Sequence, residues 1–168
     1  MRDKPAYKSV LDYYLGKVEE MKVSDLVKKE PVCTTQASTI YDVCKLMSDN
    51  SIGLVVIVES DGPKKPVGVV SERDVIRAMA ERRSLESPAW DIATKEVIKV
   101  HPDDDVGNAA MIMGIKGTRH LLVVDDSGRL EGVVSVRDII SEKSVISAIT
   151  HAYFTEPLDK YSSTATAH

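Results

Sequence analysis

The chain contains an internal duplication. The segment 68–76, Gly-Val-Val-Ser-Glu-Arg-Asp-Val-Ile, returns at 132–140 as Gly-Val-Val-Ser-Val-Arg-Asp-Ile-Ile. The similarity extends upstream, where Asp25 matches Asp91, and the first copy is two residues longer at its Pro/Gly-rich turn, 62–67. Polar surface turns tolerate such differences in length. A repeat on this scale determines the architecture, because each copy is one supersecondary unit that needs the other to bury its apolar faces.

Both copies have the same predicted order of elements, β-α-β-β-α, after a short helical turn. The middle strands are near-continuous Val, Leu and Ile, which indicates that both faces of each sheet are covered. We therefore expect an α/β (α+β) fold of two repeats packed with pseudo-two-fold symmetry, with ligand clefts between them. The predicted strands are 32–34, 54–58, 67–70, 98–100, 120–124 and 130–134, and the predicted helices are 40–49, 71–82, 106–115 and 135–153.

The duplication also divides the chain into segments. Ahead of the first copy, apolar residues at helical spacing predict a helix within 7–22, which has no counterpart before the second copy. The last residues are small and polar, and we expect them to be flexible. The five segments are a helical extension at 1–22, the first repeat at 23–83, a linker at 84–88, the second repeat at 89–153 and a tail at 154–168.

Composition excludes several classes of function. The net charge of −4 argues against nucleic acid as a partner, and no apolar run approaches the roughly 20 residues of a membrane helix. Cys33 and Cys44 form no Cys-x-x-Cys pair, so we expect reduced thiols in a cytoplasmic protein. The run 101–105, His-Pro-Asp-Asp-Asp, is typical of a helix start rather than of a metal site. No catalytic motif is present, so we expect neither an enzyme nor a metal protein.

Ser-x-Arg-Asp is the motif with chemical potential, and it allows two interpretations. Free amides at a helix start, with a Ser hydroxyl and an Arg, can bind phosphate, and an Asp one turn later can bind ribose hydroxyls. The same spacing is close to a capping box, with Ser71 or Ser135 as N-cap and Asp74 or Asp138 at the third helical position. The motif alone favours capping, and a duplicated fold duplicates its caps.

A family resemblance changes this balance. The openings Val-Ser-Asp-Leu-Val at 23–27 and Trp-Asp-Ile-Ala-Thr at 90–94, the strand Arg-His-Leu-Leu-Val-Val-Asp at 119–125, and the repeated Gly-Val-Val-Ser-x-Arg-Asp resemble the cystathionine-β-synthase (CBS) domain. Residues 23–150 as a whole resemble a tandem CBS pair, or Bateman module. Such pairs are regulatory modules that bind AMP, ADP, ATP or S-adenosylmethionine between the repeats and often form homodimers.

The resemblance implies a set of site residues. Asp74 and Asp138 would bind ribose, the Ser and Arg residues of the motif would lie near phosphate, the short first strands would border adenine, and the pair at 119–120 would reach phosphate. The first copy has Gly-Leu at 53–54 in place of Arg-His, so we expect the two clefts to differ in charge. The implied nucleotide-binding residues are Val32, Cys33, Ser71, Arg73, Asp74, Ile98, Lys99, Arg119, His120, Ser135, Arg137 and Asp138.

The resemblance implies a homodimeric regulatory protein that senses an adenosine nucleotide and signals to a separate, unidentified protein. No obligatory cofactor is implied. Two alternatives remain open: a structural interaction module whose motifs are caps only, and a nucleotide hydrolase that uses the cleft between the repeats.

Overall fold

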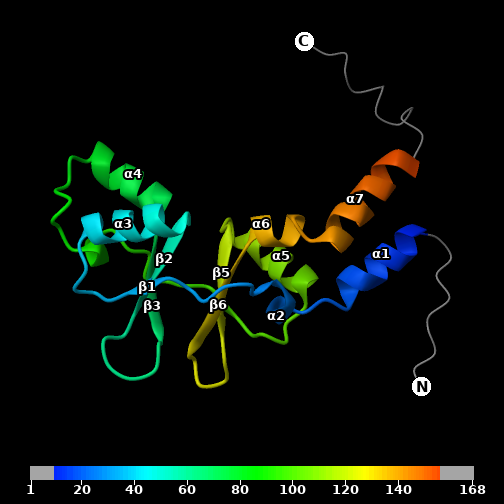
Figure 1. The fold of residues 1–168 in the computed structure, drawn as a ribbon, viewed down its shortest axis with the longest axis horizontal. Helices are drawn as coiled ribbons and strands as arrows, with labels where there is room; N and C mark the ends of the chain where they lie inside the picture. The colour runs from blue at the N-terminus through cyan, green and yellow to red at the C-terminus, as the bar shows by residue number, and fades with distance from the viewer. Residues whose placement is uncertain (1–9, 156–168) are drawn as a thin grey trace, which may run out of the picture.

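The computed structural model describes the backbone of residues 10–155 and the side chains of residues 12–150. The start of the predicted extension, 1–9, and the tail from 156 to 168 lie outside the described residues. The elements, shown in Figure 1, are α1 (Val10–Glu19), α2 (Val23–Leu26), β1 (Cys33–Thr34), α3 (Ile40–Asn50), β2 (Leu54–Val58), β3 (Pro66–Ser71), α4 (Glu72–Ala80), the 3₁₀ turn η1 (Ala89–Asp91), β4 (Lys99–Val100), α5 (Val106–Lys116), β5 (His120–Val124), β6 (Leu130–Ser135), α6 (Val136–Ile140) and α7 (Lys143–Thr155).

The strands form two equivalent three-stranded sheets. In each sheet the short first strand is parallel to the middle strand, which is antiparallel to the last, giving the orders β1-β2-β3 and β4-β5-β6. Even the irregularity in register recurs, between Ile57 and Val58 and between Val123 and Val124. The structure confirms the predicted fold class of two β-α-β-β-α repeats with an N-terminal helix.

A shared apolar core joins the two sheets. Val56 and Val58 from β2 lie in one cluster with Leu122 and Leu130 from β5 and β6. The Leu130 amide also donates a hydrogen bond to the Lys64 carbonyl, at 2.8 Å, between the two hairpins. The middle strands are almost wholly buried, as the near-continuous apolar runs predict, because the partner sheet covers the face that the helices leave open.

The opening segment of each repeat packs on the other repeat. Val23 and Leu26 of α2 lie in the core of the second sheet with Leu121 and Val134. In the reciprocal arrangement, the η1 segment packs on the first sheet, where Ala89 and Trp90 join Val55 and Val70. Val69 and Thr94 seal this contact with two backbone hydrogen bonds of 3.0 and 2.9 Å. Each sequence repeat therefore completes the core of its neighbour.

Capping side chains begin three of the helices. Thr39 is the N-cap of α3, and Ser71 and Ser135 cap α4 and α6. Asp105 precedes α5 without a side-chain cap, whereas Asp104 accepts a hydrogen bond from the His101 amide at 2.8 Å. The acidic run thus stabilises a turn, and no cluster of metal-ligating residues occurs in the described part of the chain.

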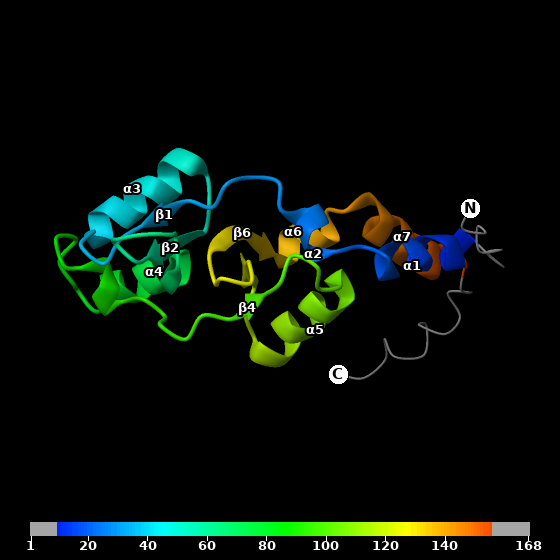
Figure 2. The same cartoon turned by 90° about the horizontal axis from the view of Figure 1, so that it is seen from below.

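The predicted continuous helix at 135–153 is wrong. The structure breaks it at Ser141 and Glu142, so that α6 stays beside the second sheet and α7 turns away to pack against α1. Figures 1 and 2 show α1 and α7 side by side at one end of the molecule. The partner for α7 is remote in sequence, so local periodicity could not reveal the break. None of the helices within 10–155 is long and apolar enough to cross a membrane.

Candidate functional site

Each Ser-x-Arg-Asp motif forms a complete capping box. The Ser71 hydroxyl and amide both donate to Asp74 Oδ2, at 2.6 and 2.9 Å, and the Asp74 amide donates back to Ser71 Oγ at 3.4 Å. Ser135 and Asp138 repeat this geometry, with distances of 2.5, 2.7 and 3.2 Å. The capping interpretation of the motif is therefore confirmed in both copies.

The capping box uses only one oxygen of each carboxylate. Asp74 Oδ1 lies 3.8 Å from an Arg77 guanidinium nitrogen, and the Arg77 side chain is exposed to solvent. Among the described residues, Oδ1 of Asp138 has no hydrogen bond or ion pair. Both carboxylates are mostly shielded from solvent, with the Asp74 side chain 12% exposed. A fixed carboxylate with one available oxygen can accept a hydrogen bond from a ligand hydroxyl, so capping and ribose binding are compatible.

Sheet register brings the second copy's predicted polar residues together. His120 pairs with Ser135 across β5 and β6, and the Arg119 carbonyl accepts a hydrogen bond from the Val136 amide at 3.0 Å. Arg119 and His120 therefore adjoin the turn of helix that carries Arg137 and Asp138. This places two cationic side chains, an imidazole and a carboxylate around the start of α6.

Charges from both copies act on His120. Burial lowers the pKa of the imidazole first, and Arg119 and Arg137 lower it further, while Asp138 and Glu72 oppose the shift. The net direction favours the neutral ring, which can both donate and accept hydrogen bonds. Glu72 belongs to the first copy, so charged groups of both copies influence the pKa of His120.

Sequence reasoning missed Glu72. It stands where the second copy has Val136, and its carboxylate lies against Gly53, where a Cβ atom would come 3.1 Å from Glu72 Oε2. The difference from Val136 was the available signal, but sequence spacing alone gave no reason to pair residue 72 with residue 53.

The predicted adenine-contacting residues lie in two separate places. Val32 and Cys33 belong to the first sheet and its edge, and Ile98 and Lys99 to the second. Cys33 packs against the core between the sheets, and its burial raises the pKa of the thiol. Figure 2 shows β1 and β4 well apart. The structure thus divides these residues into two groups, one at each sheet.

Two hollows in the described part of the molecule lie away from these residues. One, of about 360 Å³, lies between the terminal helices and α2, and the other, of about 510 Å³, lies between the two hairpins. Neither contains a predicted nucleotide-binding residue. Their lining residues are Lys17, Glu20, Met21, Asp25, Glu142 and Ser144 in the first, and Gly62, Pro63, Lys64, Arg129, Leu130 and Glu131 in the second.

Comparison with known proteins agrees with the duplicated fold. A CBS domain protein from Pyrobaculum aerophilum, solved in complex with AMP, is 39% identical, with a TM-score of 0.72 over 77% of this chain and 98% of that one. A CBS domain pair solved with 5′-methylthioadenosine and S-adenosyl-L-methionine is 28% identical, with a TM-score of 0.66 over 72% of this chain and 98% of that one.

An uncharacterized 17.7 kDa protein of Acidianus ambivalens is 34% identical over 118 residues, 70% of each chain. The family model described as CBS domain matches residues 23–81 and again residues 89–144, which are the two copies recognised by internal repetition. The chain therefore belongs to the CBS domain family and carries two tandem copies of the domain.

Proposed function

We propose that this protein is a regulatory module that binds an adenosine-containing ligand in the clefts between its two CBS repeats. The observation that carries the proposal is the carboxylate of Asp138, and its equivalent Asp74, which capping fixes through one oxygen and leaves available through the other. Relatives of the same fold were solved with AMP and with S-adenosyl-L-methionine, which supports an adenosine derivative as the ligand.

The proposed contacts follow the chemistry of a nucleotide. Asp74 and Asp138 accept hydrogen bonds from ribose hydroxyls, and residues at the beginning of the short strands β1 and β4 border the base. Guanidinium, imidazole and hydroxyl groups near the helix starts contact phosphate. The proposed base contacts are Val32, Cys33, Ile98 and Lys99, and the proposed phosphate contacts are Ser71, Arg73, Arg119, His120, Ser135 and Arg137.

A purely structural module is the second candidate, because the complete capping boxes give both Ser-Asp pairs a sufficient structural role. Asp42 provides a matched control: it occupies the same position in the capping box of α3, with Thr39 as N-cap, and is not one of the proposed contacts. Asp42→Ala and Asp138→Ala should each cost about 1 kcal/mol of stability through the lost cap.

Calorimetric titration with AMP and S-adenosylmethionine separates the two candidates. We expect Asp138→Ala or Asp74→Ala to lose at least tenfold in affinity, while Asp42→Ala binds as the unmodified protein does. Equal affinities in all three variants would mean that the carboxylates are caps only. Absence of binding to the unmodified protein would favour the structural module.

Regulation would follow from linkage. A ligand that contacts both repeats favours one relative arrangement of them, and a separate protein responds to that arrangement. We propose α1 and α7 as the responding elements, because they pack on each other at the end of the molecule, beyond the paired sheets. This arrangement lets them follow a displacement of the second repeat to which they are attached.

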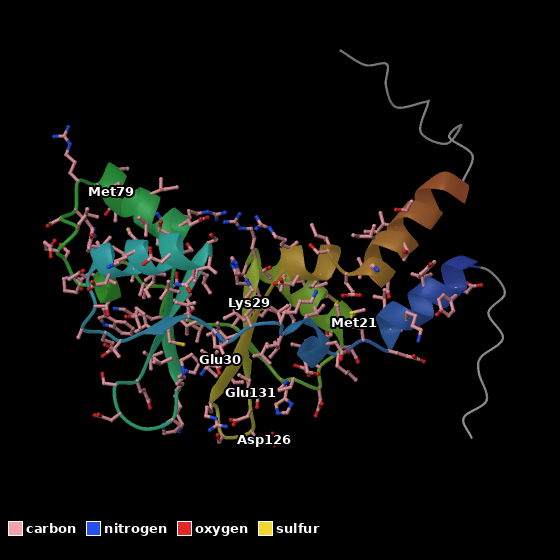
Figure 3. The ribbon with its side chains drawn as sticks, viewed as in Figure 1. Met21, Lys29, Glu30, Met79, Asp126 and Glu131 are labelled. Atoms are coloured by element: carbon pink, nitrogen blue, oxygen red, sulfur yellow. The ribbon has the colours of Figure 1, made fainter. Side chains whose placement is uncertain are left out.

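A homodimer is the proposed assembly. Apolar side chains are exposed on the helices of both repeats, with Ile76 and Ile115 68% and 74% exposed, and Met79, labelled in Figure 3, also exposed on α4. Ile76 on α4 and Ile140 on α6 are equivalent in the duplication, and both are exposed. A second copy of the chain can therefore cover both side chains through one symmetric interface. Sedimentation equilibrium should give the mass of a dimer, and Ile76→Glu or Ile115→Glu should reduce it to a monomer. A monomeric unmodified protein would contradict the proposal.

A further inference from the structure

The two repeats carry opposite charges at the point where the residue before the middle strand meets the first residue of the helix that follows the last strand. The amide of Glu72, the first residue of α4, donates to the Gly53 carbonyl at 3.1 Å, and the amide of Val136, the first residue of α6, donates to the Arg119 carbonyl at 3.0 Å. The same two backbone positions therefore adjoin in both copies. Their side chains are Gly and Glu in the first copy but Arg and Val in the second.

The Glu72 side chain fills the space that glycine leaves. A Cβ atom on Gly53 would lie 3.1 Å from Glu72 Oε2 and 3.2 Å from its Cδ. Among the described residues, no hydrogen bond or ion pair engages this carboxylate. The first copy thus presents an unneutralised negative charge at the position where the second copy presents a guanidinium.

The influence of Glu72 extends to the second copy. Glu72 opposes the lowering of the His120 pKa, together with Asp138, so its carboxylate acts electrostatically on a residue proposed to contact phosphate. The Glu72 carboxylate also lies against Gly53, which is the position equivalent to Arg119, a proposed phosphate contact, so a ligand phosphate bound at the equivalent place in the first copy approaches Glu72. The repulsion increases with the charge of the ligand, because Coulomb energy is proportional to the product of the charges.

We propose that Glu72 is a specificity-determining residue, which makes the clefts prefer adenosine derivatives of low negative charge and disfavour the triphosphate. This inference rests on the proposed function and names the class of ligand. A fixed like charge is a direct way to reject a wrong ligand without altering the contacts to the base and ribose that both ligands share.

The test is calorimetric titration with adenosine, AMP and ATP at low ionic strength, where screening is weakest. Glu72→Gln removes the charge and keeps the shape. Glu131→Gln is the matched control, because Glu131 is exposed on β6 and lies toward the hairpin end, away from α4 and α6 (Figure 3). A second variant, Glu72→Val with Gly53→Arg, reproduces the pair found in the second copy.

In Glu72→Gln we expect ATP affinity to rise about tenfold, AMP affinity about threefold and adenosine affinity by less than twofold. The double variant should raise ATP affinity further, and Glu131→Gln should change none of the three by more than about twofold. If the ligands bind but Glu72→Gln leaves the ratio of ATP to adenosine affinity unchanged, the specificity role is wrong while the proposed function stands. If none of the three binds to any of the proteins, the proposed function fails and the inference fails with it.

Discussion

At the scale of single residues, the two carboxylate oxygens of each capping aspartate have different surroundings. Asp138 and Asp74 satisfy the helix start through Oδ2 alone, so the same side chain can stabilise the fold and remain available to a ligand. The sequence posed capping and ribose binding as alternatives, but the geometry makes them compatible. In the proposed function, the same local fixation would orient the carboxylate before a ligand binds and so reduce the entropy lost on binding.

His120 predicts a pH dependence of stability. Its pKa is lowered in the folded state, chiefly by burial, so the unfolded chain binds more protons around and below the ordinary value of 6.5. The contribution of His120 is therefore complete above that value and is lost as pH falls through it. Between pH 7.5 and 5.5, urea unfolding of His120→Gln should lose less stability than that of the unmodified protein.

His101→Gln is the control for this measurement, because His101 is half-buried beside Asp126 in the turn before α5 and not at the start of α4 or α6. The His101→Gln variant keeps His120, so its stability should still fall with pH by the amount that His120 contributes. An identical loss of stability with pH in the His120→Gln variant and the unmodified protein would contradict the assignment.

At the scale of elements, the opening segment of each repeat packs on the last strand of the other repeat, and this exchange of segments depends on a glycine at the equivalent position of each strand. A Cβ atom on Gly132 of β6 would lie 2.5 Å from Val27, which follows α2, and one on Gly68 of β3 would lie 3.0 Å from Trp90 of η1. Each glycine thus allows the segment from the other repeat to lie directly on the strand. The duplicated glycines were visible in the sequence, but their function became clear only from the packing.

Gly132→Ala should therefore destabilise the protein by about 1–3 kcal/mol, because the branched Val27 side chain cannot move aside without disturbing the core. Gly107→Ala is the matched control. Gly107 lies in α5 with open space around its would-be Cβ, so alanine should stabilise the helix by about 0.5–1 kcal/mol.

Chemical unfolding followed by circular dichroism measures both changes. Equal stabilities of Gly132→Ala and the unmodified protein would show that the second sheet accommodates the extra methyl group. The close packing of Val27 on β6 would then make no measurable contribution to the free energy of unfolding.

At the scale of the whole molecule, the exchange makes the two repeats depend on each other. Leu26, from the first repeat, is buried in the core of the second sheet, and Trp90, from the second repeat, packs on the first. An isolated repeat would lack part of its own core and would expose the strand faces that meet between the sheets. The two repeats should therefore fold as one cooperative unit.

Leu26→Ala tests this dependence, with Val55→Ala in the first sheet as its counterpart. Each variant should shift one shared unfolding transition to lower denaturant concentration. The free energy of unfolding should fall by about 2–5 kcal/mol for Leu26→Ala and by somewhat less for Val55→Ala. Trp90 fluorescence, which reports on the first sheet, should shift together with circular dichroism, which reports on both. Two separate transitions, each sensitive to one of the variants, would contradict cooperative folding.

The sequence by itself determined the repeat, the order of elements, most strand and helix bounds and the family, because duplication, apolar periodicity and capping residues are local signals. Only the tertiary structure decided which sheet each opening segment completes, where the last helix breaks, and that Glu72 lies against Gly53 and acts on His120. Those features depend on contacts between residues far apart in the chain. Local propensity carries no record of which distant surface a segment will meet, so burial and charge there are set by packing alone.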